Sequence, residues 1–313
     1  MEITAQVKER VVSALLEDMR QRGCKSQNEY AQYIQRLLNI SFDKSAMSQI
    51  KKPEGRNAIK ETSWLKLATH FNVFGEKRWR TAQTGTFVTV TTALNLCKNH
   101  GVWQVLCDNA GIGKTYAATK FAEAHKENAI YVDCSQCTSK TEFITEVGRQ
   151  LGLERTTTYN QLWREAVDQM LLMQNPVLIL DEFGDVADSV ITLLKGTYNK
   201  ADRGDFMAMG CYMIGADNLR KRLIDGRKNK RQSYAEFWSR IDNNITDLGF
   251  STKQDVYRQE LREEVEQIVV LNLPDKLGDK CHEIIDKVMK TNGTRAIRKE
   301  LAKYTEIKNL NAV

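Results

Sequence analysis

A short glycine-containing loop ends in lysine and threonine about a third of the way along the chain. It lies between an apolar run at 102–107 and a helical pattern that reaches about His125, and it reads Asp-Asn-Ala-Gly-Ile-Gly-Lys-Thr over 108–115. Glycines let backbone N–H groups close around phosphates, and the following helix points its positive dipole end at them. Strand, loop and helix in this order are the context of a P-loop. Phosphate contacts are therefore expected from Asn109, Ala110, Gly111, Ile112, Gly113, Lys114, Thr115 and Tyr116.

Two residues of this loop have distinct expected roles. Lys114 would reach the β- and γ-phosphates of ATP, and the hydroxyl of Thr115 would hold Mg²⁺. Position 108 departs from the pattern because it is aspartate where glycine is usual. A carboxylate gains nothing from facing phosphates, so we expect Asp108 to turn away and hydrogen-bond the loop.

A second apolar run ends in two carboxylates. Residues 176–180 are Pro-Val-Leu-Ile-Leu, and Asp181 and Glu182 follow directly. Asp181 fits a role in orienting Mg²⁺ and its water. Glu182 is a candidate general base that polarises the attacking water.

Three further residues are candidates for sensing or stabilising the γ-phosphate. Asn218 follows a predicted strand at 207–215, where a polar side chain can sense that phosphate. Asp217 is the less favoured candidate, and a loop cap explains the position equally well. Arg240, in Phe-Trp-Ser-Arg-Ile, resembles an arginine finger offered to a neighbouring subunit. Arg295 opens a helix after Gly293 and resembles a lid arginine aimed back at the nucleotide. An ordinary solvated arginine is the alternative for both.

Strands and helices alternate through the middle of the chain, which predicts a parallel α/β sheet flanked by helices. A further strand is expected at 129–133. Helices are expected near 140–151, 160–174 and 186–200.

The N-terminal part is predicted to be all helical. Apolar periodicity marks helices at 7–22 and 62–71, and a capping box of Ser26 and Glu29 opens another between them. A short element at 45–52 has the place of a recognition helix in a helix-turn-helix domain, because small polar side chains approach base edges while lysines meet phosphates. A helical protein-interaction module is the alternative. The candidate DNA contacts here are Ser48, Gln49, Lys51 and Lys52.

The net charge of +6 on 313 residues is small, but its distribution is uneven. Residues 1–80 hold 15 basic against 9 acidic residues, and residues 220–231 hold 7 against 1, so the remainder is acidic. We call the second segment the basic island. It is a candidate for sequence-independent DNA binding, with a solvated loop as the alternative. Its members are Arg220, Lys221, Arg222, Arg227, Lys228, Lys230 and Arg231.

Other features of the composition narrow the class of protein. No apolar run is long enough to span a membrane and no signal peptide is visible, so we expect a cytoplasmic protein without a membrane partner. Seven cysteines at irregular spacing read as reduced thiols. Cys134 and Cys137 form a single CxxC, which is more typical of structural thiols than of a metal or redox site.

Together the P-loop, the Asp-Glu pair, the late Ser-Arg and the C-terminal Gly-x-Arg resemble the AAA+ ATPases over about residues 85–310. A helix-turn-helix before such a core resembles the target-selection ATPases of the Mu B, TnsC and IstB group. This resemblance implies an ATPase that assembles as a ring or helical filament on double-stranded DNA and stimulates a transposase. The domains expected are a helix-turn-helix domain at 1–75, a linker at 76–88, an AAA+ core at 89–250 and a small helical lid at 251–313.

Two alternatives share these features. A helicase-loader-like ATPase would have the same core. A nucleotide-sensing DNA-binding regulator would lack turnover, and Glu182 argues against it.

Overall fold

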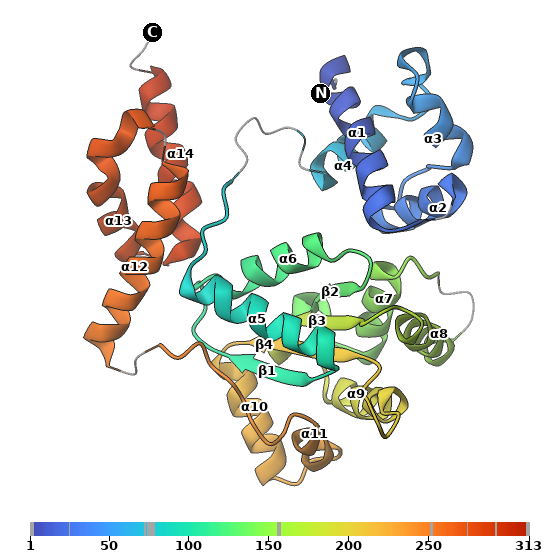
Figure 1. Ribbon diagram of the computed structural model, residues 1–313, viewed down its shortest axis with the longest axis vertical. Coiled ribbons are helices and arrows are strands. Elements are labelled where there is room, and N and C mark those ends of the chain that lie inside the picture. The colour runs from blue at the N-terminus through green and yellow to red at the C-terminus, as the bar shows by residue number, and fades with distance from the viewer. Residues whose placement is uncertain are drawn as a thin grey trace.

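The computed structural model describes residues 3–24, 26–71, 73, 79–154, 158–250, 253–273, 275–291 and 293–310. Figure 1 shows a central sheet wrapped by helices, with N-terminal helices on one side and C-terminal helices on another. Positions 72 and 74–75 of the predicted N-terminal domain, and 76–78 of the predicted linker, lie outside the described residues.

The sheet has four parallel strands in the order β1-β4-β3-β2. They are β1 (Trp103–Cys107), β2 (Ala129–Asp133), β3 (Val177–Asp181) and β4 (Gly210–Gly215). Every residue of β3 and β4 is buried, which explains why their sequences read as continuous apolar runs. The prediction of a parallel α/β sheet is confirmed. The last strand begins at Gly210 rather than at 207, because Met207 pairs in an isolated antiparallel bridge with Asp202.

Helices cover both faces of the sheet (Figure 1). Helices α5 (Gly85–His100) and α6 (Lys114–Ala124) cover one face through Val90, Leu94 and Phe121. The other face lies under five helices: α7 (Lys140–Gln150), α8 (Tyr159–Leu171), α9 (Asp188–Ala201), α10 (Asp217–Lys228) and α11 (Tyr234–Arg240).

Helix α5 corrects the predicted linker. Residues 85–88, placed in the linker by the sequence, form its first turn, and the Thr84 hydroxyl caps it by accepting a hydrogen bond from the Phe87 N–H. Its threonines and valines lack a strong helical signal, because β-branched residues lose side-chain freedom in a helix. Packing against the sheet determines the helix here.

The N-terminal head, as we call residues 3–73, contains α1 (Ala5–Gln21), α2 (Gln27–Leu38), α3 (Lys44–Ile50) and α4 (Glu61–His70). Ser26 caps α2 by accepting from the Glu29 N–H, as predicted. Tyr30, Ile34 and Trp64 lie in its own buried core. The predicted recognition helix corresponds to α3, which stops at Ile50, so that Lys51 and Lys52 follow it.

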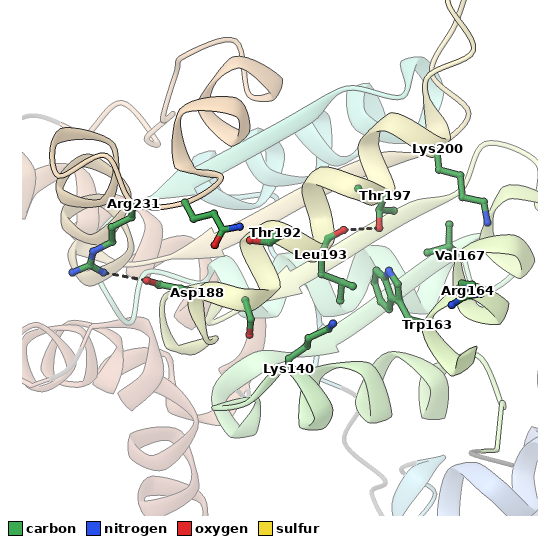
Figure 2. A pocket seen from close by; sticks show the side chains of 13 residues that line it. Lys140, Trp163, Arg164, Val167, Asp188, Thr192, Leu193, Thr197, Lys200 and Arg231 are labelled. Atoms are coloured by element: carbon green, nitrogen blue, oxygen red, sulfur yellow. Dashed lines mark hydrogen bonds and ion pairs between the residues drawn. The ribbon is translucent and has the colours of Figure 1, made fainter. Parts of the chain in front are cut away.

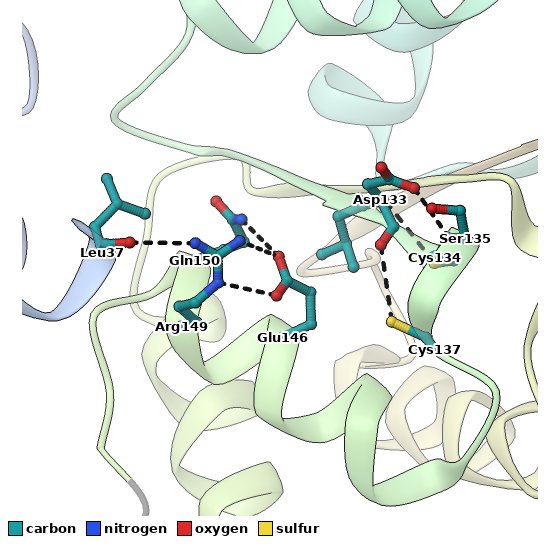
Figure 3. Close-up of polar contacts among 9 residues, drawn as sticks. Leu37, Asp133, Cys134, Ser135, Cys137, Glu146, Arg149 and Gln150 are labelled. Carbon is teal, nitrogen blue, oxygen red and sulfur yellow. Dashed lines mark hydrogen bonds and ion pairs between the residues drawn. The ribbon is translucent and has the colours of Figure 1, made fainter. Parts of the chain in front are cut away.

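The head contacts the core through α1 and α2. The Arg149 guanidinium donates to the Leu37 carbonyl at 3.2 Å (Figure 3), and Arg36 Nε donates to Glu154 at 3.1 Å. Lys126 forms an ion pair with the buried carboxylate of Asp18. Helix α3 is left with Ser48 and Gln49 exposed.

Three C-terminal helices pack together, and we call them the lid after their expected role: α12 (Gln254–Asn272), α13 (Cys281–Met289) and α14 (Thr294–Leu310). Val265, Ile284 and Ile297 are buried between them. Trp79 packs on this cluster, and the Arg80 N–H donates to the Asn272 side chain at 2.7 Å, so the segment before α5 belongs to the lid surface. Within the described residues, no helix has the length and apolarity required to cross a bilayer.

The two cysteines of the CxxC are buried after β2 (Figure 3). The Cys134 thiol donates to the Val132 carbonyl and the Cys137 thiol to the Asp133 carbonyl, each at 3.8 Å. Among the described residues, no cluster of three histidine, cysteine or acidic side chains could hold a metal ion.

Candidate nucleotide site

The P-loop turns from β1 into α6 through two glycines in the left-handed region. Gly111 has φ +80° and Gly113 has φ +104°, backbone conformations that residues other than glycine rarely adopt. Lys114 and Thr115 are the first residues of α6, so the N–H groups at the start of that helix face the loop.

Lys114 is held inside this loop. Its side chain is largely buried, and Nζ donates to the carbonyls of Asp108 and Asn109 at 2.7 and 2.6 Å. Burial lowers the pKa of Lys114, whereas the carboxylates of Asp108, Glu182 and Asp181 act in the opposite direction. The ammonium group therefore lies where a bound anion could take the place of the two carbonyl oxygens as its hydrogen-bond acceptor.

Asp108 supports the loop from its outer side. One carboxylate oxygen accepts from the Asn109 N–H at 2.7 Å, and the other accepts from the Leu248 N–H at 2.8 Å. Both oxygens are thus occupied by backbone donors, and the predicted hydrogen bond to the loop is confirmed.

Asp181 ends strand β3 near Lys114, and Glu182 follows it in the turn. Asp181 is buried and accepts from the Tyr131 hydroxyl at 2.9 Å and from the Glu182 N–H at 3.0 Å. Glu182 has φ +51°, which is uncommon for a residue with a side chain and is typical of functional turns. The sequence analysis did not single out Tyr131. The one available indication was a tyrosine hydroxyl in the predicted strand at 129–133, which could lie beside the strand that ends in Asp181.

Charged residues from the P-loop, from β3 and the turn after it, and from α14 all act on the carboxyl group of Glu182. Burial, followed by Asp181 and Asp185, raises the pKa of Glu182, and Lys114 and Arg295 oppose this shift. A raised pKa brings a carboxylate closer to the range of an effective general base. Arg295 thus acts electrostatically on Glu182 from α14, and its expected role toward the nucleotide stays a prediction.

The lid touches the P-loop directly. The Thr294 hydroxyl donates to the Gly111 carbonyl at 2.5 Å. Gly293 has φ +61°, and a β-carbon added there would lie 3.4 Å from the same carbonyl oxygen. On α12, Glu264 accepts from the Thr86 N–H at 2.6 Å, and burial raises the pKa of Glu264. Any movement of the lid therefore changes contacts of the phosphate loop.

A group of side chains between lid and core surrounds Tyr116. Its hydroxyl lies 2.7 Å from that of Thr81, and the Arg298 guanidinium lies 5.8 Å from its ring centroid and 4.9 Å from that of Trp79. Tyr116 was predicted from the loop. Thr81, Trp79 and Arg298 were missed, because contacts between the segment before α5 and the lid have no sequence pattern.

Asn218 lies on the first turn of α10 rather than at a strand end. Its amide donates to Asp185 at 3.4 Å, and its side chain lies against Gly184. It therefore borders the turn that follows Glu182.

Arg240 lies elsewhere in the chain, on α11. Its guanidinium donates to Asn199 at 2.6 Å and is 5.2 Å from the Tyr198 ring centroid. The contacts recorded for it are with α9 and α11, so its predicted role toward a neighbouring subunit stays a prediction.

The basic island divides into two groups. Arg220 donates to the Cys107 carbonyl at 2.8 Å, and Arg222 donates to the Gly184 carbonyl at 3.0 Å and to Asp188 at 2.8 Å. Arg220 therefore holds the end of β1, and Arg222 holds the turn after β3 and the start of α9. The others have exposed side chains, with Arg231 also paired to Asp188 at 3.3 Å: Lys221, Arg227, Lys228, Lys230 and Arg231.

Asp185 gives a pH test of this site. Replacing Asp185 with asparagine removes a negative charge that raises the pKa of Glu182. If Glu182 is the general base of ATP hydrolysis, as its sequence context predicts, its carboxylate form is the active form, and the acidic limb of the pH–rate profile should move to lower pH. Phosphate release measured across the acidic range checks this, and a limb that stays in place or moves to higher pH would contradict it.

Residues 104–223 match the family model of the AAA domain. No curated protein shows significant similarity to the chain. Among solved structures, Cdc6p from Pyrobaculum aerophilum is similar at 16% identity and a TM-score of 0.48, and the match covers 68% of this chain. It covers 56% of that protein, so this chain spans little more than half of its length. The family match and the geometry of the loop agree: residues 104–223 are similar to the AAA domains, which are P-loop domains.

Proposed function

We propose that the chain is an AAA+ ATPase that binds double-stranded DNA without sequence preference when ATP is bound. It would assemble as a ring or helical filament on target DNA and deliver that DNA to a transposase. Hydrolysis to ADP and phosphate would then release the filament.

The observation that carries the proposal is helix α10. It begins at the site, where Asn218 borders the turn after Glu182 and Arg220 holds the end of β1. The helix is twelve residues long and ends in Arg227 and Lys228, both exposed. A single helix thus joins the nucleotide site to a cationic surface, which supports coupling of nucleotide state to DNA contact.

The donor set at the site fits Mg²⁺–ATP. The Thr115 hydroxyl and the Asp181 carboxylate are hard oxygen ligands of the kind that Mg²⁺ prefers. Lys114 would neutralise the β- and γ-phosphates, and Mg²⁺ would add further positive charge there. Glu182 would accept a proton from the water that attacks the γ-phosphorus, as the bond to the β-phosphate oxygen breaks.

The exposed lysines at the end of α10 give the test. The double variant Lys228→Glu/Lys230→Glu should bind a DNA duplex about tenfold or more weakly, with a shallower salt dependence, since each phosphate contact adds to that slope. Fluorescence anisotropy of labelled duplex, with a slowly hydrolysed ATP analogue and over a salt series, measures both.

A control with the same charge change is Lys299→Glu/Lys303→Glu on α14, whose lysines are also exposed. It should retain the affinity and the slope of the unmodified chain. Equal losses in both variants would mean that total charge rather than this surface binds DNA. Binding that ignores nucleotide would favour a simple DNA-binding regulator.

A further inference from the structure

A groove of about 800 Å³ lies between α8 and α9, on the sheet face that α7 to α11 cover (Figure 2). Lys140 at the start of α7 borders it, and Arg231 and Gln232 border it beyond the end of α10. No residue of the P-loop, nor Asp181 or Glu182, lines it. Its volume lies within the range of ligand-binding clefts. Apart from Arg231, which also belongs to the basic island, the proposed function leaves its lining without a role.

The floor of the groove is apolar and firmly packed. It is made by Trp163, Val167 and Leu193, of which the first two are buried in the core. The Trp163 ring lies 5.7 Å from that of Phe143, centroid to centroid, so its position is fixed from behind. Such a floor favours apolar side chains of a ligand, because a charged group over it would lose hydration without a partner.

The rim is cationic. Lys140, Arg164, Lys200 and Arg231 come from four separate segments and surround the floor (Figure 2). The carboxylate among the lining residues is Asp188, and it already accepts from Arg222, Arg231 and the Tyr234 hydroxyl. Lys200 shares an ion pair with Asp168. The rim therefore carries a surplus of positive charge that is complementary to carboxylates.

Gly196 gives the groove additional depth. It lies inside α9, is exposed, and a β-carbon added there would meet no atom within 4 Å. Packing within the chain therefore does not require glycine, although glycine destabilises a helix interior relative to alanine. The missing side chain leaves room for a ligand to approach the helix backbone.

From these features we infer that the groove docks an acidic segment of a partner protein. Apolar side chains of that segment would occupy the floor, and its flanking Asp or Glu residues would pair with the rim. A nucleic acid strand would satisfy the cations but would leave the apolar floor uncovered. The docking mode is that of an amphipathic segment in a groove, read by alternating apolar and charged contacts.

The test uses the full chain and a displayed library of random peptides of about twelve residues, long enough to span such a groove. Selection on the unmodified chain is compared with selection on Gly196→Glu, which adds bulk and negative charge at an exposed helix position. Gly196→Ala is the matched control. Arg164→Glu reverses a charge of the rim on α8 rather than on α9. It replaces Gly196→Glu in the comparison if that variant fails to fold.

Peptides that combine Leu, Ile or Phe with flanking Asp or Glu should be enriched on the unmodified chain and on Gly196→Ala. Their enrichment should fall about tenfold or more on Gly196→Glu and Arg164→Glu. Affinity for a labelled DNA duplex should change less than about twofold in the same variants. Enrichment that is absent, basic in character, or equal on all four proteins would overturn the inference. So would loss of DNA affinity in Gly196→Glu without an acidic peptide consensus, which would identify the groove as a nucleic-acid surface.

Discussion

Replacing Lys114 with alanine is expected to reduce ATP hydrolysis by at least about 10²–10³-fold, the typical effect of removing one positioned group that stabilises transition-state charge. The structure holds this ammonium group buried within the loop, on the carbonyls of Asp108 and Asn109. A phosphate at that position would meet a cation whose attraction water screens little. Phosphate release at saturating ATP measures the effect.

Lys120→Ala is the matched control for this variant. Lys120 lies on the same helix, but its side chain is partly exposed and pairs with Glu123, and its Nζ lies 5.8 Å from the ring centroid of Tyr116 rather than inside the loop at 108–115. Its loss should leave hydrolysis within about twofold, as expected for a surface ion pair. If Lys114→Ala hydrolysed ATP like the unmodified chain, the assignment of the phosphate loop would be wrong.

The second large effect is expected for Glu182→Gln. The amide keeps the size of the side chain but cannot accept the proton of the attacking water, so hydrolysis should fall about 10²–10⁴-fold while ATP still binds. Because hydrolysis is proposed to release the filament, DNA should stay bound after ATP is added. Phosphate release, nucleotide binding and retention of a labelled duplex are the three measurements.

Asp185→Asn separates this role from a general effect of charge. Asp185 adds to the same electrostatic environment but lies beyond the strand end, in the turn that follows Glu182. It should keep most of the activity near neutral pH and change only the acidic limb. Equal loss of hydrolysis in both variants would remove Glu182 from the role of general base.

The central sheet and its phosphate loop could be predicted because both are local. β3 is apolar at each position between Val177 and Leu180, and Gly111 and Gly113 mark a loop by type and spacing. The capping boundary at Ser26 was predicted for the same reason, since its hydrogen bond spans three residues.

The features that were missed depend on distant parts of the chain. α5 forms against the sheet although its own sequence favours it weakly, and Tyr131 meets Asp181 through strand order rather than spacing. The contacts of individual side chains in the basic island could not be predicted either, since they also depend on distant residues. From composition alone, all basic residues of this segment are equivalent. The fold distinguishes them, because Arg222 is bound to Gly184 and Asp188 whereas Lys228 is exposed.

Electron microscopy of the full chain with duplex DNA tests the central claim most directly. Samples with and without a slowly hydrolysed ATP analogue are compared, and the variant Lys114→Ala serves as the nucleotide-binding control. The account predicts regular rings or filaments on DNA with the analogue, and bare DNA without it or with the variant. Assemblies that form equally without nucleotide, or DNA that stays bare in all samples, would contradict it.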